Sequence, residues 1–182
     1  MRFLAAGLLL AVIAGCSPTL VSTSSPVTPS PAGESDLFDP VSMRIHPIFT
    51  QVKSWTGRNA ADGIEAVLEF QDRFGDTTKA SGTVLFELYS YRTGFPDHRG
   101  ARQAEPWIAS LDSVDSQKLH WRSEIGAYDF LLALPTVSTS TDYVLTAMFE
   151  PPSGRRLFAQ TIIIGQKKTS HPATRPALDL PE

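Results

Sequence analysis

The stretch that decides the fold is YVLTAMFEPPSGRRLFAQTIII, residues 143–164. Its first eight residues can form a strand with one consistently apolar face, because successive side chains of a strand point to opposite sides. That face carries Tyr143, Leu145, Ala147 and Phe149. The following Pro151-Pro152-Ser153-Gly154 supplies two fixed backbone torsions and a glycine, which suits a tight turn. The segment therefore predicts an antiparallel hairpin with Tyr143, Leu145 and Phe149 packed inside.

The second strand of this hairpin ends in three consecutive isoleucines, residues 162–164. An apolar run of this kind is typical of a strand that is covered on both faces. We therefore expect protein on both sides of the strand at this point.

The chain before the hairpin contains further short strands separated by turns. In residues 64–71, for example, Ile64, Ala66, Leu68 and Phe70 form one apolar face, and Glu65, Glu69 and Gln71 fall on the other. Other candidate strands are residues 41–46, 83–91, 107–111, 119–123 and 128–134, while residues 112–119 could form a short helix or a linking turn. About eight strands predict an all-β domain, a single two-layer antiparallel β-sandwich. The last hairpin resembles the closing hairpin of an immunoglobulin-like or fibronectin-like domain, and a C2-like sandwich remains an alternative.

Composition limits what the protein can bind. A chain of 182 residues with 42% hydrophobic content is long enough for one domain with a core. Its 16 basic and 19 acidic residues give a net charge of -3, so we predict no nucleic-acid partner. The single cysteine excludes an internal disulfide and a cysteine-based metal cluster.

The amino terminus has the pattern of an export signal. Arg2 precedes an apolar run, residues 3–15, which is shorter than the roughly 20 residues of a membrane-spanning helix. The run ends in Val-Ile-Ala-Gly-Cys, residues 12–16, and this ending resembles the lipobox of bacterial lipoproteins. The resemblance implies that residues 1–15 are a signal peptide that is removed. It also implies that Cys16 is lipidated, with fatty chains such as palmitate, and anchors the protein in a membrane of the bacterial envelope.

The segments that flank the domain differ from it in composition. Residues 16–36 contain the cysteine followed by a region rich in serine, threonine and proline, which predicts a tether that could reach roughly 60 Å. Residues 167–182 predict a disordered tail, which leaves residues 37–166 as the sandwich domain. In an organism with two membranes, Ser17 after the cysteine is compatible, by analogy, with the outer membrane or the periplasmic face.

One loop partly resembles an acidic calcium loop. Asn59, Asp62 and Glu65 carry side-chain oxygens at plausible spacing, but calcium takes about six to eight oxygen ligands. A plain turn into the next strand explains the same residues, so we predict no metal or other cofactor, and these three residues remain weak candidates.

Two tyrosines are the first candidates for a binding surface. Tyr89 and Tyr91 fall on the strand face opposite to Phe86 and Leu88, where exposed aromatic rings could stack on a sugar or contact a protein. Five arginines at positions 92, 99, 102, 155 and 156 are expected to be dispersed over the surface.

The sequence contains no motif of a known catalytic class. We therefore predict a lipid-anchored, non-enzymatic binding or assembly module of the envelope with a protein or glycan partner. Two alternatives stay open. One is an envelope enzyme whose dispersed residues, for example Asp97, His98 and Glu105, meet only in the fold. The other is a calcium-stabilised, adhesion-type sandwich.

Overall fold

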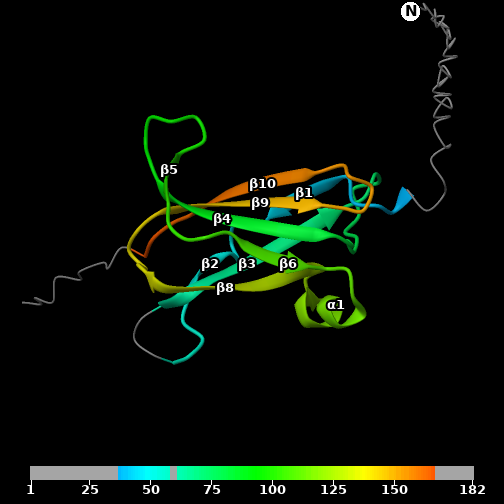
Figure 1. Ribbon diagram of the computed structural model, residues 1–182, viewed down its shortest axis with the longest axis horizontal. Coiled ribbons are helices and arrows are strands. Elements are labelled where there is room, and N and C mark those ends of the chain that lie inside the picture. Colours follow the sequence, from blue (N-terminus) through cyan, green and yellow to red (C-terminus); the bar gives the residue numbers. More distant parts are fainter. Residues whose placement is uncertain (1–36, 58–60, 167–182) are drawn as a thin grey trace, which may run out of the picture. The chain divides into compact units, whose positions relative to one another are not determined.

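A computed structural model describes residues 37–57 and 61–166 of the chain (Figure 1). The elements in order are β1 (Ser42–Ile45), β2 (Gln51–Lys53), β3 (Ala61–Gln71), β4 (Thr83–Tyr91), β5 (Arg99–Arg102), β6 (Trp107–Ser110), α1 (Val114–His120), β7 (Trp121–Arg122), β8 (Ala127–Val137), β9 (Tyr143–Glu150) and β10 (Leu157–Ile163). The predicted signal peptide, lipidated Cys16, tether, carboxy-terminal tail and Asn59 all lie outside the described residues. Among the described residues, no helix is long and apolar enough to cross a membrane.

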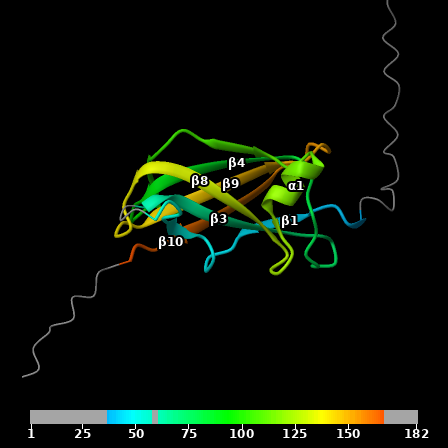
Figure 2. The same ribbon diagram turned by 90° about the horizontal axis from the view of Figure 1, so that it is seen from below.

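The strands form two antiparallel sheets that face each other, so the predicted all-β sandwich is confirmed (Figures 1 and 2). Sheet A has the order β1-β3-β8-β7, with β2 also paired to β3. Sheet B has the order β10-β9-β4-β5, with β6 also paired to β4. The short helix α1 lies at one end, and the loop between β4 and β5 rises beyond the strands at the other (Figure 1).

The strand order is that of an immunoglobulin-like sandwich. In the usual lettering, β1, β3, β8 and β7 correspond to strands A, B, E and D, and β4, β9 and β10 to strands C, F and G. Tyr143 at the start of β9 supports this correspondence, because its hydroxyl accepts a hydrogen bond from the Ser138 backbone N–H at 3.0 Å. A tyrosine at this corner that bonds backbone just upstream is a hallmark of the fold. The immunoglobulin-like prediction is thus favoured over the C2-like alternative.

The core lies between the inner faces of the two sheets. Aromatic rings fill its centre: Phe70 packs against Phe149 with ring centroids 4.7 Å apart, and Phe86 packs against Phe130 at 5.0 Å. These four rings are at most 2% exposed. Large fully buried side chains of this kind supply most of the stability of a small domain that lacks a disulfide.

The predicted hairpin at residues 143–164 is confirmed. β9 and β10 pair antiparallel, and Tyr143, Leu145 and Phe149 are buried. In the turn, the Gly154 N–H donates to the Pro151 carbonyl at 2.9 Å, and Gly154 has a φ of +80°. A residue with a β-carbon would be strained in that conformation, which explains the glycine.

The prediction for the isoleucine run is wrong. Ile163 points into the core, but Ile162 and Ile164 are 37% and 77% exposed, so no described residue covers the outer face of β10 there. Two further differences concern short elements. Residues 119–123 form the end of α1 and the two-residue β7 rather than one strand, and β2 and β5 are strands in segments where none was predicted.

Candidate functional site

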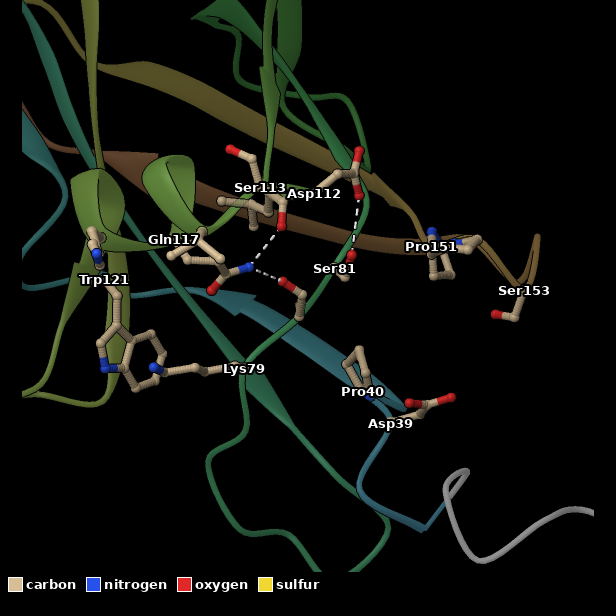
Figure 3. A pocket seen from close by; sticks show the side chains of 15 residues that line it. Asp39, Pro40, Lys79, Ser81, Asp112, Ser113, Gln117, Trp121, Pro151 and Ser153 are labelled. Atoms are coloured by element: carbon tan, nitrogen blue, oxygen red, sulfur yellow. Dashed lines mark hydrogen bonds between the residues drawn. The ribbon is translucent and has the colours of Figure 1, made fainter.

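A pocket opens at the end of the sandwich where α1 lies (Figure 3). Its volume is about 870 Å³, within the range of about 300–1,000 Å³ that is typical of ligand sites. The lining comes from the chain before β1, the loop before β4, the region from the end of β6 to β7, and the β9–β10 turn. The residues are Asp39, Pro40, Lys79, Ala80, Ser81, Leu111, Asp112, Ser113, Val114, Gln117, Lys118, Trp121, Pro151, Pro152 and Ser153.

Hydrogen bonds fix α1 as one wall of the pocket. The helix is capped by Ser113, whose side chain accepts the Ser116 backbone N–H at 3.1 Å. One turn later, the Gln117 side-chain amide donates to the carbonyls of Ala80 and Leu111, both at 2.7 Å. Because those carbonyls belong to two different loops, one side chain joins three segments of the lining.

Tyr128 of β8 extends this network beneath the pocket. Its hydroxyl donates to Gln117 Oε1 at 2.7 Å and accepts the Ala80 backbone N–H at 3.0 Å. Burial raises the pKa of the Tyr128 phenol, so the hydroxyl stays protonated and able to donate. The base of the pocket is therefore preorganised, which lowers the conformational-entropy cost of binding a ligand.

Trp121 and the lysines form a basic, aromatic side of the pocket. The Trp121 ring meets Tyr128 edge to face, with centroids 5.0 Å apart. The Lys79 ammonium lies 5.1 Å from the centre of the Trp121 ring, and Figure 3 shows this side chain reaching toward the indole. Lys118 of α1 also lines the pocket. An anionic group of a ligand would find favourable charges here.

The remaining lining is apolar with an acidic rim. Pro40, Pro151 and Pro152 provide rigid apolar rings, and Val114 on α1 is 69% exposed. Two carboxylates, those of Asp39 and Asp112, lie away from Trp121 (Figure 3). The Asp112 carboxylate accepts hydrogen bonds from the hydroxyls of Ser81 and Ser110 at 3.1 and 3.0 Å. The pocket thus combines apolar contact surface with groups of both charges.

The lining contains serine, lysine and aspartate side chains but no histidine or cysteine. In the described part of the chain, no three histidine, cysteine, aspartate or glutamate side chains are grouped so that they could hold a metal ion.

The predicted tyrosine pair lies at the opposite end of the sandwich, on the outer face of sheet B. Both rings are only half exposed, because the β4–β5 loop packs on them. The Tyr89 hydroxyl donates to Glu87 at 2.9 Å and its ring lies 5.5 Å from the Arg99 guanidinium. The Tyr91 ring stacks on His98 with centroids 5.1 Å apart. Their binding role stays a prediction.

The five arginines are less dispersed than expected. Arg92, Arg99 and Arg102 all belong to the β4–β5 hairpin, whereas positions 155 and 156 lie in the β9–β10 turn at the far end. Arg102 pairs with Glu87 at 2.5 Å, and Arg99 pairs with Asp97 at 2.8 Å.

The three residues given as an example of a dispersed active site have separate contacts in the described structure. The Asp97 carboxylate is held by Arg99, whose hydrogen bonds lower the Asp97 pKa, and His98 packs on Tyr91. In the described structure, no hydrogen bond joins Asp97, His98 and Glu105 to one another.

Asp62 and Glu65, the two weak calcium candidates that the structure describes, both have protein partners. Asp62 accepts hydrogen bonds from the backbone N–H groups of Trp55 and Thr56, both at 2.8 Å, and from the Ser54 hydroxyl at 3.0 Å. These bonds, above all that from the Thr56 N–H, lower the Asp62 pKa to about 2. Glu65 instead pairs with Lys53 across β2 and β3 at 2.5 Å. Both carboxylates thus lie in β3 and have protein partners, Asp62 in the segment before the strand and Glu65 in β2.

The sequence contained a signal for part of the pocket. Ser113 and Ser116 form a capping pair before an apolar residue, which is a helix-start pattern. Contacts such as Gln117 to Ala80, 37 positions apart, have no counterpart in sequence periodicity, so the pocket itself could not be predicted.

The chain matches no known protein-family model, and a comparison with curated proteins found no match. Function is therefore inferred from the chemistry of the site and of the amino terminus.

Proposed function

We propose that this chain is a lipid-anchored protein of the bacterial envelope whose sandwich domain is a non-enzymatic binding module. In this proposal Cys16 carries the lipid, residues 17–36 hold the domain away from the membrane, and the pocket beside α1 takes an extended segment of a protein partner. The observation that carries the proposal is the preorganised pocket, in which apolar rings are combined with cations on one side and carboxylates on the other.

A polypeptide segment suits this lining better than a small uniform ligand. Proline rings and Val114 offer apolar contacts to side chains, while the rim offers both hydrogen-bond donors and acceptors to a peptide backbone. The two lysines can pair with an acidic residue of the partner near Trp121, and Asp39 and Asp112 with a basic residue at the other side. Charges of both signs would also fix the direction in which the segment binds.

Site-specific photo-cross-linking in the native host tests this proposal. A photoreactive amino acid at Val114 should yield one defined protein adduct, because Val114 lines the pocket and is 69% exposed. The matched control is Leu119, on the same helix and 67% exposed, which does not line the pocket. Equal adducts from both positions would count against the pocket as the binding site.

A second measurement identifies the bound segment. A synthetic peptide that spans the cross-linked residue of the partner should change the tryptophan fluorescence of the purified protein. The change should be absent in Trp121→Phe, since Trp121 is the tryptophan that lines the pocket. A change that persists in this variant would show that the peptide binds elsewhere.

A further inference from the structure

Four apolar side chains form a continuous row across the outer face of sheet B. The strand register places Leu85 of β4 opposite Ile108 of β6 and Met148 of β9, and places Met148 opposite Phe158 of β10. Ile108 and Phe158 at the two ends of the row are 71% and 69% exposed. Leu85 and Met148 between them are half-buried. A row of large apolar groups on the solvent side of a sheet is a feature of interaction surfaces.

Polar rows lie on both sides of this apolar row. Toward the β4–β5 loop, the next outward-facing positions are Glu87, Thr146 and Gln160. Toward the opposite end they are Thr83 and Glu150. An apolar centre with a polar rim is the usual composition of a protein interface.

The β4–β5 loop bounds the face at one end. The Gln160 side chain donates to the Asp97 carbonyl at 2.9 Å, so the loop reaches over β9 to β10. Arg92 is the first residue of this loop, and its guanidinium packs 4.1 Å from the centre of the Phe95 ring. Arg92 forms no salt bridge with any residue that the structure describes.

We propose that a second copy of this chain covers the apolar row. A two-fold axis that runs along the row sets the row of one copy against the same row of the other, as an isologous interface requires. The same axis places the β4–β5 loop of each copy at the far end of its partner. Arg92 then approaches the end of the sandwich that carries Asp112, whose carboxylate forms no salt bridge within the described residues, and Glu150, which already pairs with Arg156 at 2.8 Å.

The rim is compatible with this arrangement. Rotation about the row sets Glu87 of one copy opposite Thr83 of the other, and Thr146 opposite Glu150. Glu87 and Glu150 therefore do not face each other, so repulsion between these two carboxylates does not oppose the contact.

The size of the face agrees with a weak dimer. The four strands have four to nine residues each, and at a spacing of about 4.8 Å and a rise of about 3.3 Å they give roughly 450 Å² per copy, to which the raised loop adds. The total of roughly 1,000 Å² is at the lower limit of specific interfaces. Such a contact is expected to form mainly when the two copies are confined together. Anchoring in one membrane, which is part of the function proposed above, provides that confinement.

Cross-linking of the full chain in membranes of the native host tests the dimer. In Phe158→Cys, the two introduced thiols lie next to each other on the axis, so a short bismaleimide should trap a dimer. Leu131→Cys is the matched control, because Leu131 is 55% exposed on the outer face of the other sheet, on β8. Dimer yield that is equal for the two variants would overturn the proposal.

A second variant tests whether the apolar row is responsible. Adding Ile108→Asp to Phe158→Cys should reduce the trapped dimer at least about fivefold, since it places a charge at the interface. Leu131→Asp in the same background should leave the yield unchanged. A yield that falls equally in both, or in neither, contradicts docking through this row.

The chain without an introduced cysteine distinguishes a failure of the dimer proposal from a failure of the proposed lipid anchor. Its one thiol, Cys16, is consumed if it is lipidated, so the unmodified chain should give no cross-link. A cross-link in the unmodified chain would contradict lipidation of Cys16. In that case the dimer proposal would be tested by comparing Phe158→Cys with Leu131→Cys in chains that also carry Cys16→Ser.

Discussion

Truncation of Leu145 to alanine tests the facing of the central strand β9. Leu145 is fully buried, and its cross-strand neighbours Leu88 and Thr161 are also buried, at 0% and 9% exposed. Because both neighbours belong to paired strands, the surroundings have little freedom to collapse into the space. Leucine-to-alanine changes in such sites cost about 2–5 kcal/mol, and we expect about 3 kcal/mol or more here.

Thr146 provides the matched control on the next residue. Its side chain is half-buried on the outer face of sheet B, and its hydroxyl makes one long hydrogen bond of 3.4 Å to the Glu87 carbonyl. Thr146→Ala should therefore reduce the free energy of unfolding by less than about 1 kcal/mol.

Urea denaturation of a fragment of residues 37–166 measures both changes. With a slope of about 1.5–2 kcal/mol per molar urea, Leu145→Ala should lower the midpoint by roughly 1.5–2 M and Thr146→Ala by less than about 0.7 M. Equal shifts, or a larger shift for Thr146→Ala, would show that the strand faces the other way and that the core described above is wrong.

Four further outcomes are expected. The fragment 37–166 should melt cooperatively and give the circular dichroism of a β-sheet, and a helical spectrum would contradict the domain boundaries. Cys16→Ser should abolish labelling with an alkynyl fatty acid, so persistent labelling would rule out the lipid anchor. Since the Asp62 pKa is lowered from 3.8 to about 2 mainly by the Thr56 N–H, its stabilising effect is complete above about pH 4 and is lost as pH falls toward 2. Asp62→Asn should flatten the acid-unfolding curve in that window, and an unchanged slope would contradict the structural role. Tyr128→Phe leaves buried partners unpaired and should cost about 1–3 kcal/mol in thermal or urea unfolding, whereas no loss would show that the hydroxyl network is unimportant.

The sequence predicted the strands in which buried apolar side chains alternate with more exposed ones. β4 was placed at residues 83–91 and β9 at residues 143–150, as the structure has them, because each has a buried face of large side chains. β5, with the sequence RGAR, has no such face. It is held at the sheet edge by backbone pairing with β4, and backbone pairing leaves no pattern in the sequence.

The isoleucine run shows a different limit of sequence interpretation. Hydrophobicity at residues 162–164 correctly indicated that the outward positions are apolar, but it could not indicate what covers them. The pocket could not be predicted from the sequence for a related reason. Its lining joins loops that the sandwich brings together from distant parts of the chain, such as Lys79 and Trp121.

The position of the pocket has a mechanical consequence. Asp39 and Pro40, which precede β1, are part of its lining, and β1 starts beside the end of β3 at the same end of the sandwich. Tension between an upstream anchor and a partner in the pocket would therefore be carried by a few residues of backbone. A partner held by the β4–β5 loop would instead load the strands in shear over the length of β9, about 26 Å for eight residues. The end at which the partner is bound decides whether the hydrogen bonds of the sheets carry that load.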